Sequence, residues 1–200
     1  MRMKKLLFAS QNQNKAREVR QLLEDQYELI TLSDILYHAQ LEEPFDTFEE
    51  NAKYKSKQGY ELFGLPCFAE DAGLVIEALQ GRPGVQSARY AGNSKNADEN
   101  IDKVLAEMKQ QSKRTAYFTA VIAYFDGNHY KVFEGRINGT ILPARSGSGG
   151  FGYDPIFMPH GFVESFGTLP EALKNKISHR SKAMAEFIHW LKSKAEEPYF

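Results

Sequence analysis

Two pairs of neighbouring acidic residues are the first candidates for chemistry in this sequence. Glu42 and Glu43 precede a predicted helix, and Glu70 and Asp71 end the apolar stretch PCFAED. Hard cations such as Mg²⁺ bind carboxylate oxygens together with waters and substrate phosphates. A carboxylate that ends a buried strand is also held rigidly enough to act as a general base. Either pair alone is more typical of a surface turn, so the two pairs predict a site only if the fold brings them together.

A possible phosphate site follows the first predicted strand. The segment SQNQNK lies where a strand of residues 4–10 meets a helix of residues 12–25, for which Asn12 is the expected N-cap. In an α/β sheet the loop after a strand borders the usual ligand crevice, and the N–H groups of a helix N-terminus attract anions. An ordinary capped helix with a solvated Lys15 explains these residues equally well. Lys55, inside a predicted helix of residues 48–63, is likewise either solvated or placed to neutralise a phosphate.

The stretch SGSGGFGYDPIF contains a literal G-x-G-x-x-G motif, residues 147–152. A dinucleotide-binding loop must follow a strand and open a helix, whereas Pro155 disfavours helical angles at the residue before it. The motif therefore does not predict a phosphate loop. Two interpretations stay open: a surface turn over packed aromatic side chains, or part of a purine site. In a purine site Phe151 would stack on the base and Asp154 would hydrogen-bond to its edge.

Basic residues gather just before the last predicted helix, residues 178–194, in the segment LKNKISHR. His179 and Arg180 fall in the first turn of that helix, where cations oppose the helix dipole. A bound anion nearby would remove this conflict. Cations at the unfavourable end of a helix are a mild indication of a functional site.

The predicted elements alternate between strands and helices at first, and then form hairpins. A further helix is opened by Asn96, and turns are expected at residues 126–128 and 138–139. This order predicts an α/β fold with a mixed sheet flanked by helices. We expect a single domain of residues 1–200 with two lobes, a helical and a sheet-rich part, and a cleft between them. The remaining predicted strands are residues 27–32, 66–71, 114–125 and 129–137.

Composition excludes several classes of protein. The 200 residues carry a net charge of −1, and a nucleic-acid-binding groove would usually need a basic excess. Cys67 is the only cysteine, so an intrachain disulfide is impossible. The longest apolar run, residues 118–125, is too short to span a bilayer. We therefore expect a soluble, cytoplasmic protein that binds neither a nucleic-acid polymer nor a membrane.

Taken together, these segments resemble the inosine triphosphate pyrophosphatase family, which includes the dITP/XTP pyrophosphatases. SQNQNK is similar to the family's T-x-N-x-G-K, and TFEENAKYK, AEDAGL, PGVQSARYAG, GGFGYDPIF and ISHR have counterparts in the same order. The likeness runs nearly end to end. It has three departures: Ser10 stands for the usual Thr, Asn14 for Gly, and Glu70-Asp71-Ala72 for the common Asp-Asp-Ser.

The resemblance implies that the cleft between the two lobes is a central nucleotide-binding cleft. It also implies a homodimeric enzyme that uses Mg²⁺ to hydrolyse dITP, ITP or XTP to the monophosphate and pyrophosphate. It implies that Asp71 is the catalytic base, with Glu70 as the alternative. Glu43 and Asp71 would bind the metal, and Glu42 is the less favoured ligand. The substrate-binding residues that it implies are Ser10, Gln11, Asn12, Gln13, Asn14, Lys15 and Lys55 for the phosphates, the Ala72 backbone, and Phe151, Gly152, Tyr153, Asp154, Lys174, His179 and Arg180 for the purine and sugar.

Two other functions are weighed against this one. A nucleotide pyrophosphatase of the septum-formation-inhibitor type shares the architecture, but SQNQNK lacks the Arg pair of the S-x-S-P-R-R-like first loop expected there. A catalytically silent nucleotide sensor would not need the complete set of acidic residues and Lys15, which this chain keeps. Pyrophosphate release from ITP with Mg²⁺ discriminates between an enzyme and a sensor.

Overall fold

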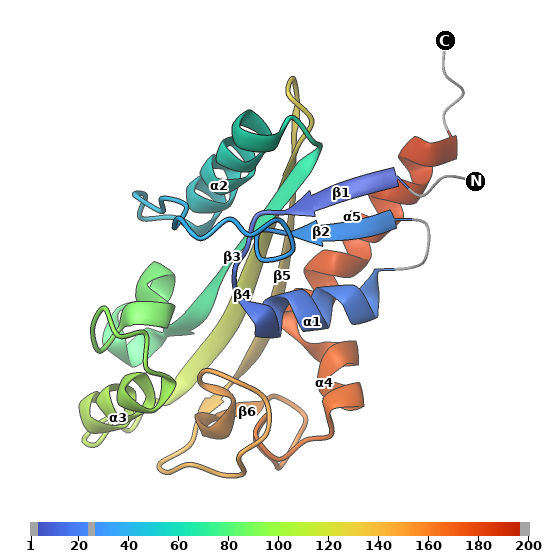
Figure 1. Ribbon diagram of the computed structural model, residues 1–200. Helices are drawn as coiled ribbons and strands as arrows, with labels where there is room; N and C mark the ends of the chain where they lie inside the picture. Colours follow the sequence, from blue (N-terminus) through green and yellow to red (C-terminus); the bar gives the residue numbers. More distant parts are fainter. Residues whose placement is uncertain (1–3, 24–26, 197–200) are drawn as a thin grey trace. The chain divides into compact units, whose positions relative to one another are not determined.

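The computed structural model describes residues 4–23 and 27–196 and shows a mixed β-sheet with helices beside it (Figure 1). Within the described residues, six strands form one sheet in the order β2-β1-β3-β4-β5-β6. The first strand pairs in parallel with the second and third, and the last two strands pair antiparallel. The predicted mixed sheet with flanking helices is therefore confirmed. The strands are β1 (Lys4–Phe8), β2 (Tyr27–Thr31), β3 (Cys67–Ile76), β4 (Thr115–Phe125), β5 (Tyr130–Ile141) and β6 (Phe157–Pro159).

The first three helices begin where local sequence signals place them. Asn12 caps the first helix, Thr47 the second and Asn96 the third, each with a side-chain oxygen that accepts backbone N–H groups. The second helix ends at Gly64, whose left-handed φ of 63° suits glycine. Residues 24 and 25, the predicted end of the first helix, lie outside the described residues. The helices are α1 (Gln13–Leu22), α2 (Phe48–Phe63), α3 (Ala97–Glu107), α4 (Glu171–Ile177) and α5 (His179–Glu196), with 3₁₀ turns at Glu77–Leu79, Gly84–Arg89 and Asp154–Ile156.

The chain divides into two compact units, and the division cuts β3, β4 and β5. Unit 1 contains the residues up to Asp71, Ala120–Gly135 and the residues from Ser181 onward. Unit 2 contains Ala72–Thr119 and Arg136–Arg180. The central nucleotide-binding cleft stays a prediction. In the described part of the chain, no helix is long and apolar enough to cross a membrane.

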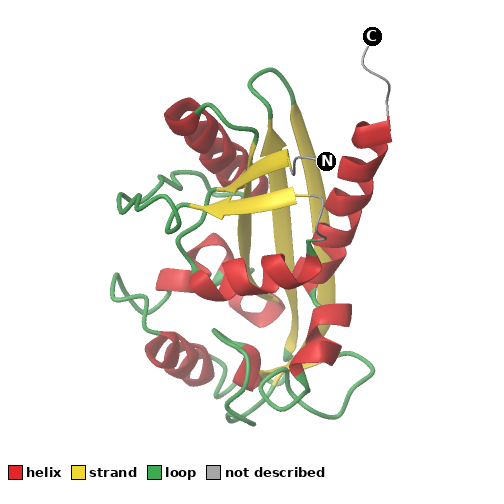
Figure 2. Cartoon of the chain, turned by 45° about the vertical axis from the view of Figure 1, so that its right-hand side comes forward, coloured by secondary structure: helices red, strands yellow, loops and turns green. Residues whose placement is uncertain are grey.

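Helices cover both faces of the strands in unit 1 (Figure 2). Val121 and Ala123 of β4 pack with Ala52 of α2. Because successive side chains of a strand point to opposite faces, Tyr124 lies on the other side, where its ring is 4.9 Å from that of Trp190 on α5. Alternate side chains of β4 thus pack against α2 on one face and against α5 on the other.

Helix α2 packs closely against the sheet at Gly59. A Cβ added there would meet the Cys67 Sγ at 2.5 Å and the Ala9 Cβ at 3.3 Å. Glycine inside a helix costs about 1 kcal/mol relative to alanine. This position keeps glycine because a side chain would separate α2 from β3.

We expect Gly59→Ala to lower the free energy of unfolding by about 1–2 kcal/mol net, because overpacking outweighs the gain in helix propensity. Urea unfolding followed by circular dichroism measures this change. The matched control is Gly59→Ala with Cys67→Ala, which removes the sulfur that the new methyl group meets. The double variant should be more stable than the additive sum of the two single changes, and simple additivity would contradict the packing argument.

The core of unit 2 is built around aromatic rings. The Phe118 ring lies 4.6 Å from that of Phe157, and the two join Phe166 in a buried cluster. The His179 ring stacks on Phe118 at 4.8 Å with an interplanar angle of 12°. Helix α3 contributes Ile101 to the same core. His179 is therefore held by packing at the start of α5.

The third strand is longer than predicted. The sequence suggested that Glu70 and Asp71 end it, but β3 continues through Ala72 to Ile76, and its side chains are buried or half-buried throughout. The residues after Asp71 are apolar or small, so both faces of the strand can be covered. The observed pairing with β1 ends where Phe8 lies opposite Phe68. The two acids therefore lie just past the end of β1, inside a strand that continues.

The predicted turn at residues 138–139 is wrong. Strand β5 runs through both residues to Ile141, and Gly139 lies opposite Pro159 of β6. A Cβ at Gly139 would lie 2.5 Å from the Met158 carbonyl oxygen and from the Phe157 Cζ. This glycine permits close strand pairing rather than a turn.

The basic segment before the last helix contains a short helix that the sequence analysis missed. Helix α4 spans Glu171–Ile177, and Ser178 separates it from α5 with an extended ψ of 160°. His179 and Arg180 occupy the first turn of α5, as predicted.

Candidate active site

The loop after β1 is organised by two of its own side chains. The Ser10 Oγ accepts the Asn12 N–H at 3.2 Å. The Asn12 Oδ1 accepts the N–H groups of Asn14 and Lys15 at 3.0 and 3.1 Å. The Lys15 Nζ lies 3.2 Å from the Glu70 Oε1. The predicted phosphate loop is thus linked to β3 through one ion pair.

The other two residues of this loop have different environments. Gln11 donates from Nε2 to the carbonyl oxygens of Tyr37 and Ala39, at 2.9 and 3.0 Å. These bonds fasten the loop to the segment that follows β2. Gln13 is the exposed first residue of α1.

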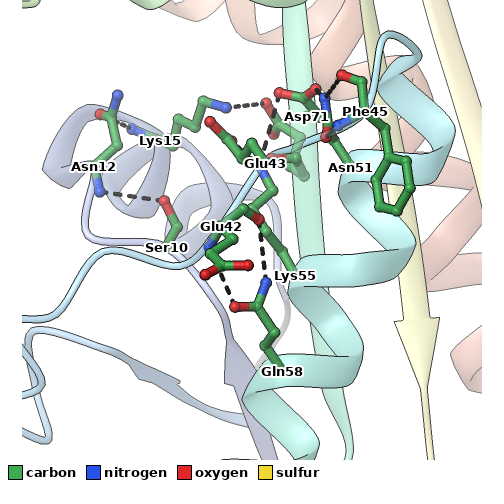
Figure 3. A network of polar contacts seen from close by, with 11 residues as sticks. Ser10, Asn12, Lys15, Glu42, Glu43, Phe45, Asn51, Lys55, Gln58 and Asp71 are labelled. Atoms are coloured by element: carbon green, nitrogen blue, oxygen red, sulfur yellow. Dashed lines mark hydrogen bonds and ion pairs between the residues drawn. The ribbon is translucent and has the colours of Figure 1, made fainter. Parts of the chain in front are cut away.

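Lys55 is the centre of an acidic cluster in unit 1 (Figure 3). Its Nζ donates to the Glu43 Oε1 at 2.5 Å and to the Glu70 carbonyl oxygen at 2.8 Å. The same nitrogen lies 3.7 Å from the Asp71 Oδ1. The fold therefore brings Glu43 together with the Glu70–Asp71 pair, which was the condition for interpreting the acids as a site.

Glu42 lies apart from this cluster. Its backbone N–H and carbonyl both bond to the Gln58 side chain, at 3.2 and 3.1 Å. Tyr54 donates its hydroxyl to the Glu42 carboxylate at 3.4 Å. Figure 3 shows Glu42 beside Gln58, whereas Glu43 lies on the side of Asp71. Of the two neighbours, Glu43 is the one that contacts Lys55.

The cluster sets two carboxylates against the Lys55 ammonium and is largely removed from water. The Asp71 and Lys55 side chains are each 8% exposed, and Glu43 is 24% exposed. Burial raises the pKa of Asp71 above its usual value, and the Lys55 and Lys15 charges oppose this rise. A carboxyl group with a raised pKa binds a proton more readily, as a general base requires.

The arrangement fits a hard cation that keeps several water or phosphate ligands. Among the described residues, no group of three or more His, Cys, Asp and Glu side chains is arranged to hold a metal by itself. Glu43 and Asp71 nevertheless converge on one positive group, the Lys55 ammonium. Mg²⁺ typically binds one or two carboxylates and takes its other ligands from water and substrate phosphates.

Asn51 is a residue of this site that the sequence analysis missed. Its Nδ2 donates to the Asp71 Oδ2 at 3.2 Å, and it is buried on the same helix as Lys55. The signal was present in the sequence, because Asn51 and Lys55 are four residues apart and so share one helix face. Two polar residues on the buried face of α2 indicate a functional site on that face.

A second group of predicted residues lies in unit 2, around Asp154. The Lys174 Nζ contacts the Asp154 Oδ2 at 2.6 Å, and the Phe151 N–H donates to the same oxygen at 2.8 Å. The Phe151 ring has the Lys174 Nζ 4.6 Å and the Arg180 Cζ 5.4 Å from its centroid. The structure therefore brings Phe151, Asp154, Lys174 and Arg180 together.

Three other residues that the resemblance implied as substrate-binding are Tyr153, Gly152 and Ala72. Tyr153 is buried, and its hydroxyl donates to the Ser87 carbonyl oxygen at 2.8 Å, so its side chain belongs to the core. Gly152 has a φ of 61°, which favours glycine in this loop. Ala72 is half-buried in β3.

Comparisons with known proteins show the family of this chain. The Ham1 family model matches residues 6–190. A dITP/XTP pyrophosphatase of Christiangramia forsetii is 45% identical over 94% of this chain and 98% of its own length. The dITP/XTP pyrophosphatase of Porphyromonas gingivalis is also 45% identical, with the same coverage of both chains. Among solved structures, a HAM1 protein from Coxiella burnetii has a TM-score of 0.88 and 36% identity, and the match covers 96% of this chain and 100% of that one.

These matches span both units and nearly the whole length of each relative. They confirm the resemblance to the dITP/XTP pyrophosphatases that the ordered sequence segments indicated. The chain belongs to the Ham1 family.

Proposed function

We propose that this protein is a dITP/XTP pyrophosphatase, which hydrolyses non-canonical purine nucleoside triphosphates such as dITP, ITP and XTP to the monophosphate and pyrophosphate. The observation that carries the proposal is the convergence of Glu43 and Asp71 on Lys55. It occurs in a chain whose relatives are named dITP/XTP pyrophosphatases. Removing these triphosphates would cleanse the nucleotide pool.

The phosphates are assigned to unit 1. Lys15, together with the other residues of the loop from Ser10, would bind the triphosphate, and Lys55 would add a second fixed positive charge. Glu43 and Asp71 would hold Mg²⁺, which supplies screening of phosphate charge when it is bound. Glu42 contributes less to this role, because its carboxylate accepts from Tyr54 and its backbone bonds to the Gln58 side chain.

Asp71 is the proposed general base. It would take the proton from a water that attacks the α-phosphorus, and no covalent intermediate is required. Glu70 is the less favoured candidate, because its carboxylate pairs with Lys15. A positioned base of this kind typically contributes about 10²–10⁴-fold to the rate.

The purine and sugar are assigned to residues of unit 2. Phe151 would provide a stacking surface, and Asp154 would hydrogen-bond to the edge of the base. Donors from the backbone, His179 and Arg180 would match the O6 atom of hypoxanthine or xanthine. A site built on such hydrogen bonds can reject a substrate that leaves them unpaired by about 10⁴–10⁵-fold. Adenine, with an amino group at that position, would be rejected in this way.

Pyrophosphate release from dITP, ITP, XTP, GTP and ATP, each with Mg²⁺, tests the proposal. We expect dITP, ITP and XTP to be hydrolysed at least about 10²-fold more efficiently than ATP, measured as kcat/KM. Binding of dITP without pyrophosphate release would instead identify a nucleotide sensor. Preference for another base would support an enzyme of the septum-formation-inhibitor type.

We further propose that both units form one domain and that the protein is a cytoplasmic homodimer that binds no nucleic acid or membrane. The family match across residues 6–190, which includes both units, supports the single domain. The near-neutral net charge of −1 supports a small-molecule substrate over a polymer. Size-exclusion chromatography with light scattering tests the dimer.

A further inference from the structure

Asn51 is almost fully buried, with 1% of its surface exposed. A buried polar side chain is costly unless it forms hydrogen bonds. Apolar residues would fill the same helix face at lower cost. The contacts of Asn51 therefore indicate what the residue does.

The first contact is a closed pair of hydrogen bonds with one residue of the preceding loop. The Phe45 N–H donates to the Asn51 Oδ1 at 2.9 Å, and the Asn51 Nδ2 donates to the Phe45 carbonyl oxygen at 2.9 Å. A carboxamide has both an acceptor and donors, so it satisfies both backbone groups at once. Glu43 is two residues before Phe45, so this pair fastens the Glu43 segment to α2.

The second contact uses the remaining hydrogen of the same nitrogen. Asn51 Nδ2 donates to the Asp71 Oδ2 at 3.2 Å, whereas the Asp71 Oδ1 faces Lys55 at 3.7 Å. The two oxygens of Asp71 thus have different partners on one helix. Rotation of the carboxylate would break one contact or the other.

We propose that Asn51 is a positioning residue, whose one carboxamide fixes the Asp71 carboxylate relative to the loop that carries Glu43. This inference rests on the proposed function, because it assigns Asn51 to the geometry of the proposed metal ligands and base. The carboxamide of Asn51 is used by Phe45 and Asp71, so we assign it no contact with the substrate. Misplacing a catalytic group by about 1 Å can cost about 10²-fold in rate, so the effect of losing Asn51 should be large.

Two variants separate the two contacts. Asn51→Leu has a similar size and removes every hydrogen bond. Asn51→Asp keeps an acceptor for the Phe45 N–H but cannot donate to Asp71, and it places a second carboxylate against it. The matched control is Ser56→Ala on the same helix, which removes a buried hydroxyl that bonds only within α2, to the Lys53 carbonyl oxygen.

Amide hydrogen exchange of Phe45 measures the first contact without any substrate. We expect Asn51→Leu to accelerate exchange at Phe45 at least about 10-fold, since the N–H loses its acceptor. Asn51→Asp and Ser56→Ala should leave it near the wild-type rate. Unchanged exchange in Asn51→Leu would overturn the proposal, whatever the activity of the protein.

Kinetics and metal binding measure the second contact. In both Asn51 variants kcat for dITP should fall about 10–100-fold, and KM should stay within about twofold because the phosphate-binding lysines are kept. Asn51→Leu should also bind Mn²⁺ more weakly than wild type in calorimetry without nucleotide. Ser56→Ala should retain wild-type kcat and Mn²⁺ affinity.

Retention of wild-type kcat in Asn51→Leu, or an equal loss in Ser56→Ala, would overturn the proposal. Thermal unfolding of each variant identifies a loss that is due to unfolding. If the wild-type protein releases no pyrophosphate, the proposed function fails, while Phe45 exchange and Mn²⁺ binding still decide the role of Asn51.

Discussion

Asp71→Asn is expected to abolish dITP hydrolysis, with kcat reduced by at least about 10³-fold. An amide of the same shape cannot accept the proton of the attacking water, and it is a poor ligand for Mg²⁺. The fold should survive, because the Asn oxygen can still accept the hydrogen bond from Asn51 that Asp71 accepts now. Burial already disfavours the charged form of Asp71 and raises its pKa, so a neutral side chain is tolerated there.

Pyrophosphate release in single-turnover conditions measures the chemical step, and dITP binding is measured separately by calorimetry. Binding should remain within about 10-fold of wild type, because Lys15 and Lys55 are unchanged. Asp46→Asn is the matched control, since Asp46 is an exposed acid in the loop that also carries Glu43. A kcat near the wild-type value in Asp71→Asn would remove Asp71 from its proposed role.

Lys174→Met is expected to lower the free energy of unfolding by about 3–5 kcal/mol, the usual cost of breaking a buried ion pair. Its side chain is 5% exposed and lies 2.6 Å from the Asp154 carboxylate, which is 4% exposed. Removal of the ammonium leaves a buried negative charge without this partner. Urea unfolding measures the loss, and Lys176→Met, at an exposed position of the same helix, is the control.

Neutralising the other partner should restore much of this stability. In Lys174→Met with Asp154→Asn no buried charge of the pair remains, and the Asn oxygen can still accept the Phe151 N–H that Asp154 accepts. Replacement of a whole buried pair is often nearly neutral. A double variant as unstable as the sum of its parts would show that the two side chains do not act as a pair.

Much of the local structure could be predicted because its causes are local. Asn12 and Asn96 cap their helices as expected, and Thr47 and Gly64 cap the two ends of α2, since each cap depends on residues within one turn. The hairpin turn between β4 and β5, at residues 126–128, was also predicted from local sequence. Asp126 accepts the N–H groups of Asn128 and His129 there.

The predictions that were wrong concern residues whose secondary structure depends on segments distant in the sequence. Residues 138–139 have the composition of a turn, but the approach of β6 keeps Gly139 inside a strand. The strand through Glu70 and Asp71 continues because tertiary packing covers both of its faces. Whether a polar residue in a strand is tolerated depends on partners that are distant in sequence.

By itself the sequence determined the order of the elements apart from β6 and α4, the helix caps, the acidic pairs and the family resemblance, because all of these are properties of short segments or of their order along the chain. Only the tertiary structure decided that Glu43 rather than Glu42 faces Asp71, that Lys55 lies between them, and that Asn51 bonds to both the loop and the strand. The contacts of Lys55 with Glu43 and of Asn51 with Asp71 join residues 12 and 20 positions apart in the chain, and all of these contacts depend on side-chain direction. Side-chain direction and long-range proximity follow from packing, which the local pattern does not specify.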